Sequence, residues 1–317
     1  MNRIIVCIFA MIAVPGACLA QAWPDRSVRI IVPYSAGSVV DSLARVLFNK
    51  VGENTGQTFI VDNRPGASAM LGTGVVARAK PDGSTLVFAA AGPLNVNALL
   101  FKKMPYDPFQ DLTPVCSVAQ GQLVLLVSES VKAKNMKELL AEVRANGAKM
   151  AYGSSGIGTQ AHLAMADITR DTEIVHIPFS GSPQTVSGLI SNNIQMALLP
   201  IEMAAAASRA HGLRAIATLG ANRGSWMPDI PTFKEAGVNL SANGWMGVAA
   251  PGKTPSAVVE QIYKHIAVAL KDQRVIDGFR QIGYDVLVRN PTEFRDFLLA
   301  DYREWEPLIK RNNIALQ

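Results

Sequence analysis

The sequence VRIIVPYSAGSVVD, residues 28–41, predicts a strand over 28–32, a short turn and an amphipathic helix over 40–51. A second segment, MAYGSSGIGTQAH, residues 150–162, repeats this order of strand, small-residue turn and helix. A helix that begins on small residues leaves its first N–H groups unpaired, and these donors and the helix dipole favour an anion. Two such turns predict two lobes that close on one anionic ligand.

Strand-like and helix-like segments alternate along the rest of the chain, which predicts an α/β fold with largely parallel strands. Further strands are expected at 58–62, 85–89, 123–127, just before Gly153, and at 195–199 and 213–219. Further helices are expected at 69–79, 136–144, 183–191, after Thr254-Pro255, and at 291–310. Residues 92–114 are expected to form a long loop.

Two strands, 122–128 and 244–250, are expected to cross between the lobes and to form a hinge. The first lobe is then discontinuous and contains residues 23–125 and 247–317. The second lobe contains residues 126–246.

The N-terminus has the three parts of a secretory signal peptide. Arg3 precedes the apolar run 4–14, and small residues follow over 15–22, with cleavage expected after Ala22 or Ala20. Lipid attachment at Cys18 is the disfavoured alternative, because Pro15 stands where such signals usually carry Leu. We therefore expect a periplasmic protein without a lipid anchor.

Composition narrows the function further. The chain has 317 residues, 49% of them hydrophobic, and a formal net charge of +5 without any run of Lys or Arg, which argues against nucleic acid as a partner. Loss of the leader leaves Cys116 as the only cysteine, so an intramolecular disulfide is excluded. We expect Cys116 to be a small buried hydrophobe, with a nucleophile as the alternative.

The first turn combines capping with possible ligand contact. Ser38 and Asp41 have the spacing of a capping box, and direct contact of Asp41 with the ligand is the alternative. The donors of Ala36, Gly37 and Ser38 are expected to stay free for the ligand. Tyr34 lies where the ligands of open α/β sheets usually bind, and plain packing is an equal alternative.

The second turn also matches the dinucleotide pattern G-x-G-x-x-A at Gly156, Gly158 and Ala161. A secretory signal argues against this ligand, and residues 72–77 match the pattern without a preceding strand. Donation to a carboxylate by Ser154, Ser155, Thr159 and nearby N–H groups is the simpler interpretation. For His162, contact within this site and a purely structural role both stay open.

The sequence contains no set of residues with the spacing of a known catalytic or metal site. The histidines His162, His176, His211 and His265 are dispersed without metal-ligand spacing, and no G-x-S-x-G sequence occurs. The acidic pairs of the last helix, Asp296 with Asp301 and Glu304 with Glu306, are expected to face solvent. We therefore predict no catalytic residue, no metal and no cofactor.

The chain resembles the periplasmic solute receptors of tripartite tricarboxylate transport systems, known as the Bordetella uptake gene (Bug) family. The resemblance spans the sequence after the leader and is carried by many collinear motifs. These motifs are WPDRSVR at 23–29, VPY at 32–34, NRPGA at 63–67, AKPDGSTL at 79–86, MPYDP at 104–108, HIPF at 176–179, LRA at 213–215, PDIPT at 228–232 and GKTP at 252–255.

The resemblance implies a type II periplasmic-binding-protein fold, in which two α/β lobes joined by two crossing strands close on a small carboxylate. It further implies a monomer that delivers this ligand to membrane permease subunits. The ligand positions implied are Tyr34, Ser35, Ala36, Gly37, Ser38, Asp41, Ala90, Ala91, Ser154, Ser155, Gly156, Gly158, Thr159, His162, Ser180, Gly181 and Pro200.

The chain departs from the family pattern at its first turn and after the strand at 195–198. Ser38 and Val40 stand where the family usually has Gly and Thr, and Leu199-Pro200-Ile201 replaces an Asp or Asn. These changes predict a more apolar cleft and a monocarboxylate or an acid with an apolar body as the ligand. The alternative function is a ligand-sensing partner of a two-component sensor kinase, without a dedicated permease.

Overall fold

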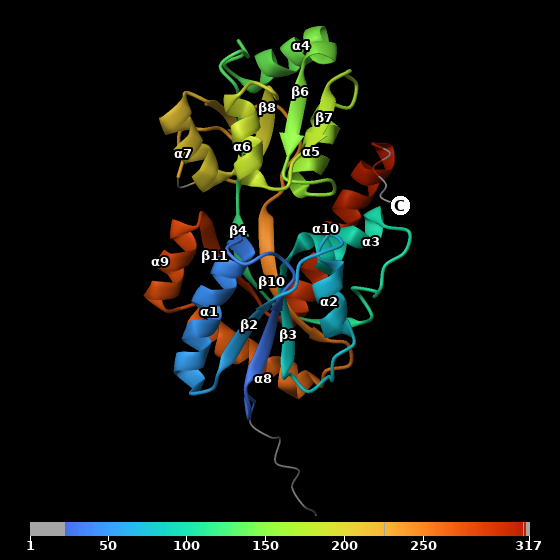
Figure 1. Ribbon diagram of the computed structural model, residues 1–317, viewed down its shortest axis with the longest axis vertical. Coiled ribbons are helices and arrows are strands. Elements are labelled where there is room, and N and C mark those ends of the chain that lie inside the picture. Colours follow the sequence, from blue (N-terminus) through green and yellow to red (C-terminus); the bar gives the residue numbers. More distant parts are fainter. Residues whose placement is uncertain (1–22, 225, 313, 315–317) are drawn as a thin grey trace, which may run out of the picture.

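The computed structural model describes residues 23–224, 226–312 and 314, so the expected signal peptide lies outside the described residues. The first of its two sheets contains β1 (Val28–Val32), β2 (Phe59–Asn63), β3 (Thr85–Ala90), β4 (Leu112–Gly121), β10 (Gly244–Pro251) and β11 (Tyr284–Arg289). Its strand order is β11-β4-β10-β3-β1-β2. Figure 1 shows this sheet in the lower of two lobes, the first lobe.

The second sheet contains β5 (Leu123–Val127), β6 (Ala151–Ser154), β7 (Val175–Pro178), β8 (Met196–Pro200) and β9 (Arg214–Thr218). Its strand order is β7-β6-β8-β5-β9, and it forms the upper, second lobe of Figure 1. The helices around it are α4 (Met136–Asn146), η2 (Gly147–Lys149), α5 (Gln160–Ile168), α6 (Ser182–Ile190) and α7 (Ile201–His211). The expected α/β architecture of two lobes is therefore present.

The helices of the first lobe come from both ends of the chain. They are α1 (Val39–Thr55), α2 (Met70–Ala77), η1 (Gly92–Val96), α3 (Asn97–Leu100), α8 (Ser256–Ala269), α9 (Gln273–Gln281) and α10 (Pro291–Arg311). The loop expected over 92–114 is therefore wrong in part, because η1, α3 and the start of β4 occupy it. Its Pro and Gly residues suggested a loop, yet Pro93 fits the first turn of a helix.

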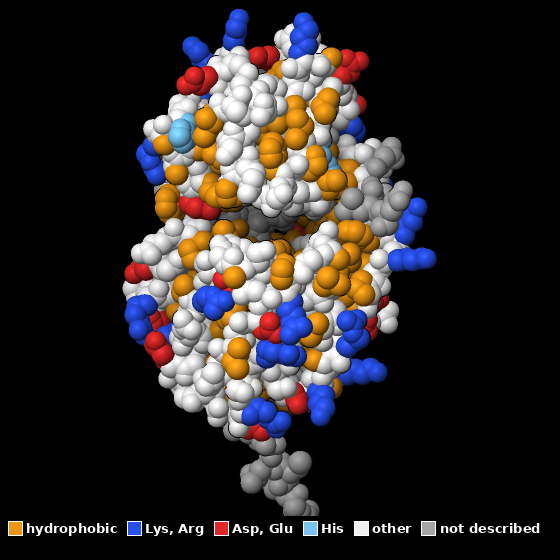
Figure 2. All heavy atoms as spheres, viewed as in Figure 1, with side chains coloured by type: hydrophobic (Ala, Val, Ile, Leu, Met, Phe, Trp, Pro, Cys, Tyr) orange, Lys and Arg blue, Asp and Glu red, His pale blue; other side chains and the backbone are white. Residues whose placement is uncertain are grey.

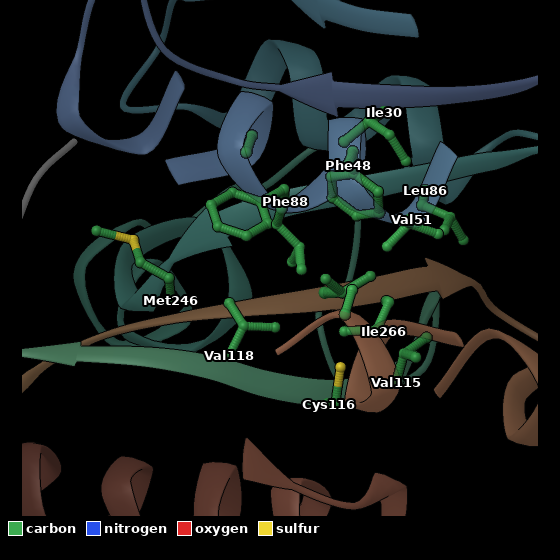
Figure 3. Packing of buried hydrophobic residues seen from close by; sticks show 14 of the residues in the cluster. Ile30, Phe48, Val51, Leu86, Phe88, Val115, Cys116, Val118, Met246 and Ile266 are labelled. Atoms are coloured by element: carbon green, nitrogen blue, oxygen red, sulfur yellow. The ribbon is translucent and has the colours of Figure 1, made fainter. Parts of the chain in front are cut away.

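Both faces of the first sheet are buried, which explains why its inner strands are continuously apolar. Ile30 belongs to the cluster on one face, and the adjacent Ile31 belongs to the cluster on the other. On the first face, Phe48 of α1 and Ile266 of α8 pack over Leu86 of β3 (Figure 3). This packing fixes the ends of β1 and β3, from which the candidate site is built.

The expectation of largely parallel strands is wrong, because five of the nine strand pairs among the described residues are antiparallel, including β11 with β4. β1 runs parallel to β2 and β3, and β6 runs parallel to β7 and β8. In contrast, β10 is antiparallel to β3 and β4, and β5 is antiparallel to β8 and β9. The reason is the chain path, because a strand that enters from the other lobe runs against the strands that point toward that lobe.

The chain changes sheets at Gln122, between β4 of the first sheet and β5 of the second. On the return path, β10 lies wholly in the first sheet from Gly244 onward. We therefore propose that the two boundaries between the lobes lie at Gln122 and just before Gly244. Both are a few residues before the expected boundaries, which follow residues 125 and 246.

Two side-chain expectations have clear outcomes. Cys116 is fully buried and burial raises the pKa of its thiol, so it is a core residue. Asp301 contradicts the expected solvated face, because it is 8% exposed and accepts a hydrogen bond from Asn95.

Among the described residues, no helix is both long and apolar enough to cross a membrane.

Candidate ligand-binding site

The first candidate turn joins β1 to α1 at the edge of the first sheet that faces the second lobe (Figure 1). Ser38 is the N-cap of α1, and its Oγ accepts a hydrogen bond from the Asp41 N–H at 3.3 Å. Gly37 has φ +78°, a conformation that glycine adopts without steric cost. Ser35, Ala36 and Gly37 are exposed, so the tip of the turn is open to a ligand.

Asp41 is 3% exposed, and its carboxylate is fully used within the first lobe. It accepts hydrogen bonds from the Gly37 N–H (2.8 Å), Asn63 Nδ2 (3.0 Å) and Arg45 Nε (3.1 Å). Burial alone would raise the pKa of Asp41, but Arg45 and these hydrogen bonds hold it below its usual value. Asp41 therefore reaches back to the main chain of the turn, as the capping interpretation expects, but to the N–H of Gly37 and not to that of the N-cap Ser38.

The free donors of the first turn differ from those expected. The Gly37 N–H is bound to Asp41, and the Ser38 N–H donates to the Ser35 carbonyl at 3.2 Å. Within the described residues, the N–H groups of Ala36, Val39 and Val40 make no hydrogen bond. These three amides, at the positive end of the α1 dipole, are the donors available to an anion.

Tyr34 is largely a packing residue. Its ring contacts the apolar clusters on both faces of the first sheet. Burial raises the pKa of Tyr34, while a hydrogen bond to its hydroxyl from the Ala90 main chain opposes this rise. The contact ties the first turn to the end of β3, where Ala90 is half-buried and Ala91 is buried.

The second candidate turn joins β6 to α5 and is stabilised by its own hydroxyl groups. Ser154 is fully buried, and its Oγ lies 3.0 Å from the Gly156 carbonyl and 2.8 Å from His176 Nε2. Thr159 is the N-cap of α5 and donates to the Gly156 carbonyl at 2.8 Å. Both hydroxyl protons expected to face the ligand are therefore used within the turn, which leaves the hydroxyl of Ser155.

His162 also has a structural role. It is 6% exposed, and its Nδ1 accepts a hydrogen bond from the Gly158 N–H at 3.0 Å. Its ring stacks on His176 with centroids 4.1 Å apart, and His176 stacks in turn on Tyr152 at 4.8 Å. Burial, with a smaller effect of His176, lowers the pKa of His162 to about 4. The neutral imidazole therefore fixes the second turn.

Sequence reasoning missed the role of His176. Its contact with Ser154 places it directly behind the turn, although the two residues belong to different strands. The parallel register that pairs Tyr152 with His176 brings them together. The motif HIPF was visible in the sequence, but nothing in it indicated this neighbour.

The remaining candidate positions of the second lobe, Ser180, Gly181 and Pro200, lie where strands end or helices begin, as the second turn does. Ser180 is exposed, and Gly181 is the N-cap of α6. Pro200 ends β8, where it pairs with Leu123 beside the sheet change at Gln122. Figure 2 shows a hollow where the two lobes meet, and β1 and β6 run toward this level from opposite sides (Figure 1).

The electrostatics of the two turns come from the main chain. Neither turn carries Lys or Arg, and Arg45 beside the first turn is committed to Asp41 and Asn63. Among the described residues, no group of three or more His, Cys, Asp or Glu side chains could hold a metal ion. The arrangement can therefore bind an anion through neutral donors at two helix starts, main-chain N–H groups at the first and the Ser155 hydroxyl at the second.

The family model described as the tripartite tricarboxylate transporter family receptor matches residues 43–314. The chain belongs to this family. Membership of a receptor family confirms that the protein is a solute-binding receptor and not an enzyme. The chain is 29% identical to protein BugT of Bordetella pertussis, over 100% of this chain and 99% of BugT.

Two solved structures of this receptor type support the fold. R. palustris Rpa4515 with adipate is 28% identical, with a TM-score of 0.83, and the match covers 92% of this chain and 99% of Rpa4515. MatC from Rhodopseudomonas palustris with bound malate is 26% identical, with a TM-score of 0.79, over 90% of this chain and 100% of MatC. The expected periplasmic-binding-protein fold is therefore confirmed.

Proposed function

We propose that this receptor is periplasmic, captures a small carboxylate between its lobes and delivers it to a tripartite tricarboxylate-type permease. The observation that carries the proposal is the pair of helix starts, one in each lobe, at which the N–H groups of Ala36, Val39 and Val40 and the hydroxyl of Ser155 make no hydrogen bond within the described residues. The residues proposed to face the ligand are Ala36, Val39 and Val40 in the first turn and Ser155 in the second. Gly37, Ser38, Asp41, Ser154, Thr159 and His162 shape the two turns.

The class of ligand follows from what surrounds these donors. No free cationic side chain is available in either turn for a second or third carboxylate. Ile157, at the tip of the second turn, is apolar and 45% exposed. We therefore propose a monocarboxylate, or an acid with an apolar body, as the ligand. Rpa4515 and MatC, whose structures hold adipate and malate, support a carboxylate in general.

Mass spectrometry of small molecules released from protein purified without refolding tests the receptor function. Calorimetric titration with benzoate, adipate, malate and citrate then tests the ligand class. We expect a released carboxylic acid and tighter binding of apolar acids than of citrate. Tight citrate binding without any response to apolar acids would contradict the proposed class.

The variant Ala36→Asp tests the first turn. A carboxylate placed beside the open N–H groups competes for them and repels an anionic ligand, so we expect a loss of affinity of about tenfold or more. Ala141→Asp, on the exposed face of α4, is the matched control and should leave affinity unchanged. Equal affinities of the two variants would remove the first turn from the site.

A further inference from the structure

Helix α10 begins in the first lobe and ends against the second. Phe294 and Leu298, early in the helix, pack with Trp245 of β10 in the first lobe. In Figure 1, the last turns of α10, shown in red, lie beside α5 of the second lobe. The helix therefore connects the lobes in addition to the two crossings of the main chain.

The contact between α10 and α5 combines a charged part and an apolar part. Arg311 Nε donates to Asp167 Oδ1 at 2.7 Å, and Asn312 Nδ2 reaches the same oxygen at 3.4 Å. One turn earlier on α5, Leu163 is fully buried and belongs to the same cluster as Leu308 and Ile309 of α10. Residues four apart lie on one helix face, so Leu163 and Asp167 form a single contact surface.

Both helices in this contact also hold a part of the candidate site. α5 begins at the second turn, where Thr159 is its N-cap. In the middle of α10, Asp301 accepts a hydrogen bond at 2.6 Å from Asn95 of η1, the segment that follows the end of β3. One helix of 21 residues thus links the site-forming end of β3 in the first lobe to the second turn in the other lobe.

We infer that Arg311 and Asp167 are positioning residues, and that α10 is a third connection that sets the distance between the two lobes. The consequence for a ligand rests on the proposed function, whereas the mechanical role does not. Neither residue lies in the two turns, so a change at this contact alters the balance of open and closed forms without removing a ligand donor.

Distances between spin labels on the two lobes, measured by double electron–electron resonance, test this inference without any ligand. Spin labels at Asn49→Cys on α1 and Gln184→Cys on α6 report the separation of the lobes, because both positions are exposed. For labelling, the full chain is prepared with the substitutions Cys7→Ser and Cys18→Ser. The native Cys116 is buried and therefore stays unlabelled. For Asp167→Asn and for Arg311→Gln, we expect the population at longer distance to rise about two- to five-fold.

Two further variants make the outcome specific. Arg223→Gln breaks an exposed ion pair with Glu235 within the second lobe and should leave the distances unchanged. The exchange of charges in Asp167→Arg with Arg311→Asp should restore the native distribution. Unchanged distances in the single variants overturn the inference, as does a failure of the exchange to restore them. Failure to bind any carboxylate would overturn the proposed function alone.

Discussion

At the scale of single residues, buried titratable groups stabilise the second turn. His162 must be neutral, because its Nδ1 accepts the Gly158 N–H and its ring lies against His176. Protonation would remove this acceptor and place a charge in a buried stack.

The pH dependence of unfolding should report this neutral imidazole. Its pKa is lowered from 6.5 to about 4, so the unfolded chain binds more protons between these values. Stability should therefore fall as the pH is lowered from about 6.5 to about 4. Urea unfolding of the wild type and His162→Gln across this range should show a shallower fall in the variant. His211→Gln, at an exposed position of α7, is the control and should follow the wild type.

At the scale of elements, the segment between β3 and α3 depends on buried polar contacts. Asp301 Oδ1 accepts from Trp305 Nε1 at 3.2 Å, in addition to the contact with Asn95 of η1. Asn97 donates to the Ser68 carbonyl at 2.9 Å, next to a left-handed turn at residues 67–69. Such backbone conformations are costly outside glycine and persist only where neighbours hold them. These contacts fix the wall of the first lobe near the site.

Removal of the Asp301 carboxyl group should lower the free energy of unfolding by the contribution of these contacts. Asp301→Ala leaves the Trp305 Nε1–H without its buried acceptor and leaves Asn95 Nδ2 only the Leu298 carbonyl, so we expect a loss of about 2–3 kcal/mol in urea unfolding. Burial raises the pKa of Asp301 from 3.8 to about 6, so the native form binds more protons between these values. The contribution of Asp301 therefore weakens as the pH rises from about 4 to about 6.

Asp296→Ala, on the exposed face of the same helix, is the control for that experiment. It should change the free energy of unfolding by less than about 0.5 kcal/mol. Equal free energies of unfolding for Asp301→Ala and Asp296→Ala would show that the buried contacts of Asp301 do not stabilise η1.

At the scale of the whole molecule, the lobes also meet beside the hinge. Gly283, in the turn between α9 and β11, packs directly on the carboxyl group of Glu202 at the start of α7. Burial raises the pKa of Glu202 to about 7, and no group in the described part of the chain forms a hydrogen bond with its buried Oε2. This contact brings a side chain of the second lobe against the main chain of the first.

Gly283→Ala should therefore destabilise the protein in two ways. Its φ of +82° disfavours any side chain, and the new Cβ would overlap the Glu202 carboxyl group. Gly237→Ala is the matched control, because Gly237 has φ +86° and no atom near a new Cβ. We expect Gly283→Ala to lower the melting temperature more than Gly237→Ala, and Glu202→Ala to recover the difference. Equal melting temperatures of the two glycine variants would contradict a packed interlobe contact at Gly283.

The sequence supported the order of elements because apolar periodicity and capping residues are local properties. The strand at 28–32 and the N-cap Ser38 could be identified from neighbouring residues in the chain, whereas Thr159, expected to bind the ligand, is the N-cap of α5. The burial of Asp301 and the stack of His162 on His176 could not be identified in this way. Each depends on a partner from another element, and no local pattern specifies that partner.

By itself, the sequence therefore determined the two strand–turn–helix units, the α/β class and the family, through local patterning and collinear motifs. Only the tertiary structure decided which donors in those units are open. Gly37, Ser38, Ser154 and Thr159 use their hydrogen-bonding groups within the turns, which leaves Ser155 and a few main-chain N–H groups. The physical reason is that a hydrogen bond depends on the distance and direction between two groups, and these are fixed only when the chain is folded.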